Sequence, residues 1–258
     1  MSDQPKPVKA LPSSSVLVIR DRAGRLEVLM QERPHTMKFA AGAYVFPGGK
    51  VEKSDLDAKL WGEIIDGDVS HDEAFKIAVI RELYEEAELL LGNNDMSEAK
   101  RHAPAAEIAR VFKREGLRVD LNSLIPFAHW VTPEIIPRRY DTMFYLTEAP
   151  SGQEVGRDGS ESMKSMWVNP HEIIEAWQED HVPLMFPTRL NLMKLARSFS
   201  VSEALEAAAN TPIYRVMPAL KSVSGVRKLT IPEEAGYGVT EVSHREMKLD
   251  IKAKPKKS

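Results

Sequence analysis

Three glutamates, Glu82, Glu85 and Glu86, have a spacing that predicts metal chemistry. In an α-helix, positions i, i+3 and i+4 lie on one face, so these residues would form a stripe of three carboxylates. Like charges at this separation repel one another and raise one another's pKa values. A divalent cation would neutralise them, and hard cations such as Mg²⁺ prefer carboxylate, carbonyl and water oxygens. The pattern therefore predicts a metal site with oxygen ligands on a helix.

The helix that carries the three glutamates is predicted to run from Ser70 to about Gly92. Ser70 and Glu73 fit the S-x-x-E pattern of a capping box at its start, and Gly92-Asn93 is a typical stop signal. Apolar residues recur between these ends at spacings of four and three, at Phe75, Val79, Leu83, Ala87 and Leu90. This apolar stripe borders the acidic one, so the glutamates are expected at the rim of the core.

The segments before this helix predict strands and one sharp turn. Residues 15–20 and 26–31 are short apolar runs joined by turn residues, which is typical of a hairpin. Residues 44–46 predict a further short strand that leads into Pro47-Gly48-Gly49, where the chain should turn. Residues 56–69 give no clear pattern beyond one or two helical turns around Trp61.

The segments after the helix predict a mixed sheet and further helices. We expect a helix near 97–115, strands at 125–131, 142–147 and 163–168, and helices at 171–179, 187–199 and 201–209. Asn169 and Pro170 are suited to the cap and first position of the helix at 171–179. Residues 213–242 hold short strand-like pieces. The order of elements predicts an α+β fold, an α/β/α sandwich with a mixed sheet between helices, plus a C-terminal elaboration.

The composition excludes several classes of protein. The 258 residues carry a formal net charge of −3, which gives no general attraction to nucleic acid or to an anionic membrane. The absence of cysteine excludes disulfides, thiolate metal sites and cysteine nucleophiles. We find no secretory signal and no apolar run long enough to span a bilayer, so we expect a cytoplasmic protein with neither nucleic acid nor membrane as partner.

The sequence resembles the Nudix hydrolases, whose box reads G-x5-E-x7-R-E-U-x-E-E-x-G-U with U apolar. Gly49 matches the first glycine, residues 81–86 (Arg-Glu-Leu-Tyr-Glu-Glu) match the central string, and Leu89 matches the last apolar position. The resemblance implies that Mg²⁺ or Mn²⁺ is bound by the Gly49 carbonyl and by Glu82, Glu85 and Glu86. It implies that Glu85 and Glu86 are principal ligands, that Glu82 is a ligand or the water-positioning base, and that Arg81 orients a carboxylate.

The box departs from the family pattern at three places. Asp55 stands where the pattern has its first glutamate. Lys50 to Ile80 is 31 residues long, where the pattern has thirteen. Glu88 replaces the final glycine, and because three leucines follow it we expect the helix to continue to about Gly92.

The long insertion resembles the Nudix branch of peroxisomal coenzyme A diphosphatases and their bacterial relatives. Residues 39–49, 130–133, 137–142 and 187–189 carry this likeness, and the resemblance extends from about Val16 to Leu195. It implies a small-molecule diphosphate substrate, in particular coenzyme A or acyl-coenzyme A. Two alternatives stay open: a Nudix hydrolase of a nucleotide sugar, ADP-ribose or a dinucleotide, and a non-hydrolysing nucleotide-binding regulator.

Further candidates for the site are arginines, one lysine and two more glutamates. Guanidinium groups match phosphate geometry, so either Arg138 or Arg139 could bind substrate phosphate, but neighbours on a strand face opposite ways and at most one should do so. Arg33 and Lys38 could also meet the substrate. An extra carboxylate to activate water could come from Glu161 or, second, from Glu134.

The expected organisation has four parts. We expect a flexible segment at 1–13, the Nudix hydrolase domain at 14–200, a C-terminal extension packed on it at 201–247, and a disordered basic tail at 248–258. Residues after about 200 could close over the pocket or form a homodimer interface, and the sequence does not choose between these roles.

Overall fold

The computed structural model describes residues 8–37, 40–65, 71–92, 108–114, 116–156, 164–223 and 225–243. Several of the predicted features therefore lie outside the described residues: Lys38, Glu161, the capping hydroxyl of Ser70, Asn93 and residues 97–107 of the helix expected near 97–115. Most of the expected terminal segments, 1–13 and 248–258, also lie outside them. No helix in the described ranges is long and apolar enough to cross a membrane.

A long N-terminal strand forms the centre of the main sheet. β1 (Leu11–Arg22) pairs antiparallel with β2 (Arg25–Glu32) and parallel with β6 (Tyr140–Glu148). β3 (Tyr44–Val45) lies beyond β2, and β5 (Ile125–Val131) and β8 (Arg215–Val216) lie beyond β6. The short β4 (Gly48–Lys50) pairs with β1, and β7 (Lys164–Val168) pairs with β2. The sheet is mixed, as predicted.

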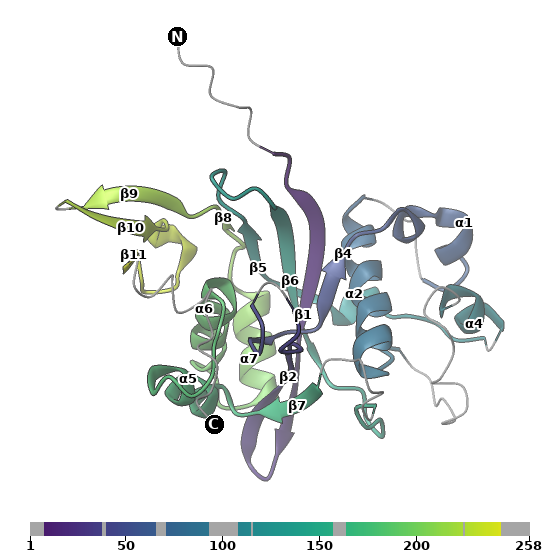
Figure 1. The fold of residues 1–258 in the computed structure, drawn as a ribbon. Helices are drawn as coiled ribbons and strands as arrows, with labels where there is room; N and C mark the ends of the chain where they lie inside the picture. Colours follow the sequence, from purple (N-terminus) through teal and green to yellow (C-terminus); the bar gives the residue numbers. More distant parts are fainter. Residues whose placement is uncertain are drawn as a thin grey trace.

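Helices cover both faces of this sheet (Figure 1). One layer contains α1 (Ala58–Trp61), α2 (His71–Ala87) and α4 (Ile108–Arg114), with the one-turn helices η1 (Lys53–Leu56) and η3 (Leu121–Ser123). The other layer contains α5 (Pro170–Gln178), α6 (Phe186–Leu195) and α7 (Val201–Ala209). The predicted α/β/α sandwich is confirmed.

The alternation of side chains along β1 joins the two layers. Val16 and Val18 are buried in the core cluster shared with α2, while Leu17 and Ile19 are buried in the cluster shared with α6 and α7. Successive residues of a strand point to opposite faces, so a continuous apolar run belongs to a strand that is covered on both sides. Asn169 caps α5 as predicted, because its Oδ1 accepts hydrogen bonds from the backbone N–H groups of His171 and Glu172.

The C-terminal residues form a second, small sheet and complete the first. β9 (Ala219–Val223), β10 (Val226–Thr230) and β11 (Glu241–Ser243) form a three-stranded antiparallel sheet, with the one-turn helix η4 (Glu233–Ala235) between β10 and β11. Just after η4, Tyr237 is buried, and its hydroxyl accepts a hydrogen bond of 2.9 Å from Trp130 Nε1 and donates one of 2.9 Å to Asn191 Oδ1.

The predicted continuation of the glutamate helix to Gly92 is wrong. α2 ends at Ala87, and Glu88 adopts a left-handed conformation with φ 55°. The backbone N–H of Gly156 donates to the carbonyl of Ala87, and the Gln153 amide bonds both the N–H and the carbonyl of Leu90. The segment after the helix is therefore held against the connection after β6, and the chain turns at Glu88 although the glycine is missing.

Candidate active site

Arg81 lies at the centre of the site and is held by a buried carboxylate. Its Nε donates to Asp55 Oδ1 at 2.9 Å and its Nη2 donates to Asp55 Oδ2 at 3.0 Å, a bidentate ion pair. The Asp55 side chain is 0% exposed and that of Arg81 is 8% exposed. Asp55 therefore contacts the arginine from the position at which the family pattern has glutamate, and the shorter side chain suffices.

The remaining donors of Arg81 reach the catalytic helix and β4. Nη1 donates to Glu82 Oε1 at 2.8 Å and lies 3.4 Å from both carboxylate oxygens of Glu85. Nη2 also donates to the Lys50 carbonyl at 2.9 Å, which fixes the arginine to the first residue of the insertion. One guanidinium thus orients Glu82 and Glu85 together.

Glycines let β4 approach both β1 and the glutamates. A Cβ at Gly49 would lie 2.0 Å from Glu82 Oε1, so a side chain there would displace the carboxylate. A Cβ at Gly48 would lie 2.3 Å from the Ser14 carbonyl oxygen of β1. The Gly48 N–H donates to Glu86 Oε2 at 3.0 Å. The two glycines therefore allow this edge of the sheet to touch the acidic face of α2.

The three glutamates carry more negative charge than their surroundings balance. Burial raises the pKa of Glu82 and of Glu85, and the neighbouring charge of Arg81 lowers it only in part. Burial raises the pKa of Glu86 to about 8, the Gly48 N–H opposes the shift, and Glu82 and Glu85 add to it. Burial lowers the pKa of Arg81, but hydrogen bonds and charge from Asp55 and Glu82 make the net shift upward.

These donor groups fit a hard divalent cation in type and in charge. Carboxylates, together with the Gly49 carbonyl, are the oxygen ligands that Mg²⁺ and Mn²⁺ prefer, and bound positive charge would oppose the burial and the neighbouring negative charges that raise the three pKa values. As they stand, no three Asp, Glu or His side chains among the described residues are grouped closely enough to hold an ion. Glu82 is instead bonded to Arg81, and Glu86 to the Gly48 N–H.

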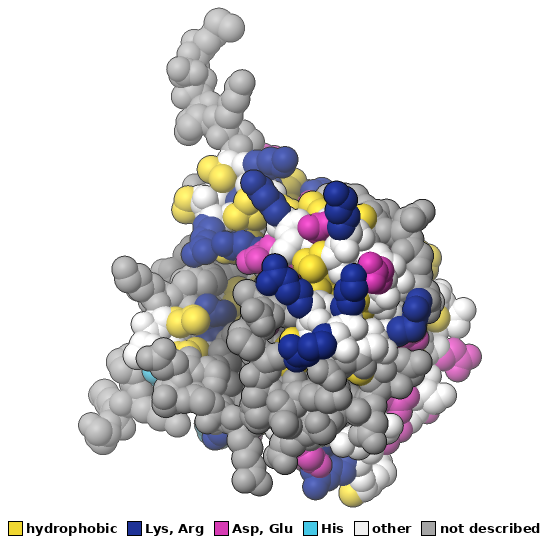
Figure 2. Space-filling model, turned by 90° about the vertical axis from the view of Figure 1, so that its right-hand side faces the viewer, with side chains coloured by type: hydrophobic (Ala, Val, Ile, Leu, Met, Phe, Trp, Pro, Cys, Tyr) yellow, Lys and Arg dark blue, Asp and Glu magenta, His cyan; other side chains and the backbone are white. Residues whose placement is uncertain are grey.

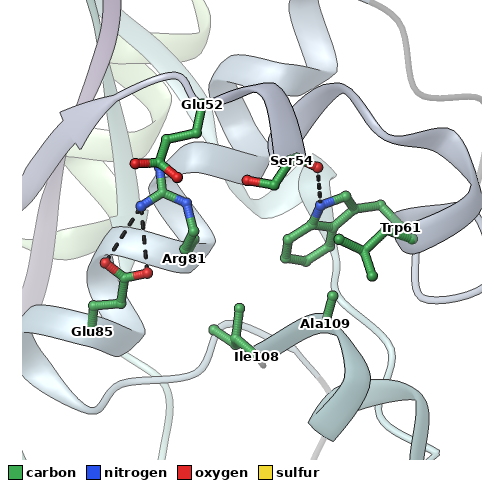
Figure 3. A pocket seen from close by; sticks show the side chains of 8 residues that line it. Glu52, Ser54, Trp61, Arg81, Glu85, Ile108 and Ala109 are labelled. Carbon is green, nitrogen blue, oxygen red and sulfur yellow. Dashed lines mark hydrogen bonds and ion pairs between the residues drawn. The ribbon is translucent and has the colours of Figure 1, made fainter. Parts of the chain in front are cut away.

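A pocket of about 300 Å³ opens beside Arg81 and Glu85 (Figure 3). Its other walls come from η1, α1 and α4, and the lining residues are Glu52, Ser54, Leu60, Trp61, Arg81, Glu85, Ile108 and Ala109. The sequence predictions missed Glu52, Ser54, Leu60 and Trp61 as site residues because the insertion shows no periodicity, and they missed Ile108 and Ala109 because these lie far from the glutamates in the sequence. The departure at Asp55 was the one signal in the sequence that pointed into this region.

The predicted arginines differ in what they contact. Arg33 lies close enough to Glu86 for its charge to lower the pKa of that carboxyl, and its Nη2 donates to Met37 Sδ at 2.8 Å. Arg139 is buried, and its guanidinium donates to the carbonyls of Thr132 and Val8, so its donors are committed to the protein's own backbone. This placement argues against Arg139 as a substrate ligand.

Two other predicted residues lie in the connection between β5 and β6. Glu134 and Arg138 are both exposed there, and the Arg138 guanidinium lies 5.7 Å from the centre of the Tyr140 ring. This connection meets the start of β1, since the Leu11 N–H donates to the Arg139 carbonyl, and β4 pairs with the same end of β1. Both residues are therefore at the end of the sheet that carries the glutamates.

The sequence matches one protein family over half of its length. Residues 60–195 match the family described as the NUDT19 Nudix domain. The chain is 30% identical over 179 residues to a Caenorhabditis elegans protein provisionally named nudix hydrolase 7, an alignment that covers 66% of this chain and 56% of the relative. It is 26% identical over 245 residues to the acyl-coenzyme A diphosphatase NUDT19 of Gallus gallus, covering 69% of this chain and 63% of the relative. The chain thus spans less than two thirds of the length of these two relatives.

A solved structure shows the same fold. A NUDIX hydrolase from Alicyclobacillus acidocaldarius superposes with a TM-score of 0.67 at 25% sequence identity, covering 79% of this chain and 99% of that protein. The superposition includes almost all of the bacterial protein.

Proposed function

This chain belongs to the Nudix hydrolase family, and from that premise we propose that it hydrolyses the diphosphate linkage of coenzyme A or acyl-coenzyme A with the help of Mg²⁺ or Mn²⁺. The substrate proposal is supported by the similarity to an acyl-coenzyme A diphosphatase. It is also supported by the motif likeness that extends through residues 187–189.

The observation that carries the proposal is the charge of the acidic face of α2. Glu82, Glu85 and Glu86 all have raised pKa values, and the only cation with several bonds to them in the described ranges, Arg81, is already paired with Asp55. A site with excess buried carboxylate is suited to bind cations, and a phosphate substrate requires them. A divalent ion bound there would lower the pKa of water and neutralise charge on the leaving oxygen.

The protein's own residues would bind the ion, accept a proton from water and orient the carboxylates. Glu86, Glu82 and the Gly49 carbonyl supply oxygen ligands on one side. Glu85 lines the pocket and is part-exposed, which supports it as the acceptor of a proton from the attacking water, with Glu82 as the second candidate. Arg81 positions both carboxylates, because it bonds each of them from a fixed pairing with Asp55.

Arg33 is our proposed phosphate ligand from the protein. Its charge acts on Glu86, which puts it beside the acidic face. Its Nε is buried and has no hydrogen-bond partner among the described residues. A guanidinium with a spare buried donor beside a metal site is suited to bind a phosphate oxygen. Arg138, at the same end of the sheet, is the second candidate.

A product-resolved assay tests the function. The protein is incubated with coenzyme A, hexanoyl-coenzyme A, ADP-ribose, a nucleotide sugar and a dinucleotide, with Mg²⁺, with Mn²⁺ or with a chelator. We expect two phosphomonoester products from the coenzyme A substrates, only when the metal is present. Faster cleavage of another diphosphate would replace the substrate proposal, and binding without cleavage of any of them would identify a regulator.

A further inference from the structure

The pocket beside Glu85 has two chemically different ends (Figure 3). Glu52, Arg81 and Glu85 form a polar end next to the catalytic helix. Trp61, Ile108 and Ala109, together with Leu60, form an apolar end built from α1 and α4. A molecule that reacts over the glutamates can therefore extend into an apolar chamber without leaving the protein.

Without a bound cation, the polar end does not suit an anionic group. Every N–H of the Arg81 guanidinium already has an acceptor: Asp55 takes two, and the Lys50 carbonyl, Glu82 and Glu85 take the others. Its charge is balanced by carboxylates, and Glu52 and Glu85 would repel a phosphate. The pocket therefore favours an uncharged chain.

The apolar walls are fixed by contacts that do not involve a ligand. Trp61 Nε1 donates to the Ser54 carbonyl at 2.9 Å, and the Trp61 ring meets Phe112 of α4 edge to face at 6.4 Å between ring centres. Phe112 in turn meets Tyr84 of α2 at 6.0 Å. The chain after Trp61 is tied down as well, since the Val119 N–H donates to the Ile64 carbonyl. Three elements thus hold the chamber open.

We propose that this pocket binds the uncharged arm of the diphosphate substrate, and that the insertion in the box thereby selects substrates with a long, largely apolar chain attached to the diphosphate. The inference rests on the proposed function for its substrate but not for its geometry. A volume of about 300 Å³ is at the lower end for small-molecule sites, which fits one arm of a substrate and not the whole molecule.

The outer surface around the pocket fits the charged remainder of such a substrate. Lys53, Lys59 and Arg110 are exposed and belong to η1, α1 and α4, the elements that line the pocket. Lys and Arg side chains gather on this face of the molecule, with fewer Asp and Glu among them (Figure 2). Phosphate groups other than the reacting diphosphate would meet cations outside the pocket, and the uncharged arm would enter it.

The test uses a probe that cannot be hydrolysed by this chemistry. S-hexanoyl-pantetheine carries an uncharged arm and has no diphosphate, so its binding does not depend on catalysis. We expect it to bind the full-length protein and to change the tryptophan fluorescence, and we expect Trp61→Phe to lose most of that change. The Ala109→Leu variant fills the chamber and should weaken binding at least about tenfold, as expected when an apolar site loses one or more methylene contacts.

The controls separate the pocket from the fold and from the activity. Ala207→Leu places the same side chain on an exposed position of α7 and should leave binding unchanged. If Ala109→Leu does not fold, Leu60→Gln, at a half-buried lining position, serves in its place. Equal affinity of the parent and the filled variants, or no binding by the parent, would overturn the inference. Failure of the proposed function would appear separately, as absence of metal-dependent cleavage in the product-resolved assay.

Discussion

At the scale of single residues, Arg81 and its carboxylates form one hydrogen-bond network in which negative charge exceeds positive charge. Asp55 forms a bidentate ion pair with Nε and Nη2 of Arg81, and Glu82 and Glu85 both accept from Nη1. The carboxylate of Glu86 accepts a hydrogen bond from the Gly48 N–H, and burial raises its pKa to about 8. The consequences can be tested by removing one charge at a time.

Neutralising Glu86 should separate activity from stability. The Glu86→Gln protein is expected to lose most of its hydrolysis, because a principal oxygen ligand is removed. The pKa of Glu86 is raised in the folded state, so its contribution to stability is present at low pH and is lost as the pH rises toward about 8. With a chelator present, the melting temperature of the parent should therefore fall relative to that of Glu86→Gln as the pH rises from about 4.5 to about 8, and the difference should change little above that.

The same experiment has an internal control and a clear contrary result. Glu175→Gln, at an exposed position of α5, should change neither the activity nor the pH dependence of melting. Added Mg²⁺ should restore the melting temperature of the parent at high pH and have little effect on Glu86→Gln. Cleavage at the parental rate by Glu86→Gln would show that the metal site is elsewhere.

Removing Asp55 should cost far more stability than lengthening it. Asp55→Asn leaves the buried Arg81 guanidinium without its bidentate partner, and loss of one member of a buried ion pair costs about 3–5 kcal/mol. Asp55→Glu retains the charge and restores the residue of the family pattern, so this variant should lose less stability. Urea unfolding of the two variants at neutral pH measures the difference, and equal stabilities would contradict the structural role given to this pair.

Arg33 should affect catalysis and not the fold. If its guanidinium binds a phosphate oxygen, Arg33→Gln should lower kcat/KM about 10- to 100-fold, since a hydrogen bond to a charged group contributes about 1.5–3 kcal/mol. Arg22→Gln, an exposed arginine in β1, is the matched control. A fall in melting temperature without a change in kcat/KM would instead assign Arg33 a structural role.

The sequence predicted the glutamate stripe, because helical spacing is local and each residue lies within one turn of the next. It did not predict the pairing of Asp55 with Arg81, since these residues are separated by 26 positions and meet only when β4, η1 and α2 are assembled. For the same reason, the sequence around Arg138 and Arg139 did not predict that the Arg139 guanidinium would donate to the carbonyls of Val8 and Thr132.

At the scale of elements, long periodic segments were predicted well and short ones were not. The strands of the main sheet and helices α5 to α7 follow from alternation, capping residues and proline positions. η1 and α1 are one-turn elements, shorter than a helix that is stable alone, and they depend on tertiary contacts such as that from Trp61 Nε1 to the Ser54 carbonyl. The sequence indicated α1 only as one or two helical turns around Trp61, and no local pattern placed η1.

The end of α2 offers a test of backbone strain. Glu88 has a φ of 55°, a left-handed conformation that costs an ordinary residue about 1–2 kcal/mol. Glu88→Gly should therefore raise the free energy of unfolding by up to about 1 kcal/mol, since the greater freedom of glycine in the unfolded chain offsets part of the gain. Glu88→Ala keeps the strain and removes the side-chain contacts, so it should be no more stable than the parent.

Chemical denaturation of the two Glu88 variants distinguishes strain from contact. If glycine and alanine destabilise the protein equally, the carboxylate contacts of Glu88 outweigh the strain. Activity is a separate readout, because the three glutamates precede Glu88 and should retain their geometry in both variants.

At the scale of the whole molecule, the net charge is negative, although positive side chains gather on one face. The formal net charge is −3, yet Lys and Arg gather on the face around the pocket (Figure 2). Long-range attraction depends on the local field and decreases with ionic strength. The positive charge on this face would attract an anionic substrate to it.

Reversing two of these charges should slow capture of the substrate. The double variant Lys59→Glu with Arg110→Glu is expected to lower kcat/KM several-fold at low salt, with little change in kcat. The difference from the parent should shrink as ionic strength rises from about 20 to 500 mM, over which the screening length falls several-fold. Lys221→Glu, on β9 away from the pocket, is the control, and a loss independent of salt would indicate a direct contact instead.

The two residues of β8 cover one edge of the main sheet, and this affects how the chain can be shortened. β8 pairs with β5 at His129 and Trp130 and is the outermost strand of the main sheet on that side. A chain shortened before Tyr214 would expose this edge of β5. It would also lose Tyr237, whose hydroxyl accepts a hydrogen bond from the Trp130 indole N–H. Bare strand edges recruit strands from other molecules, so the truncated domain should aggregate on storage even where its catalytic residues are intact.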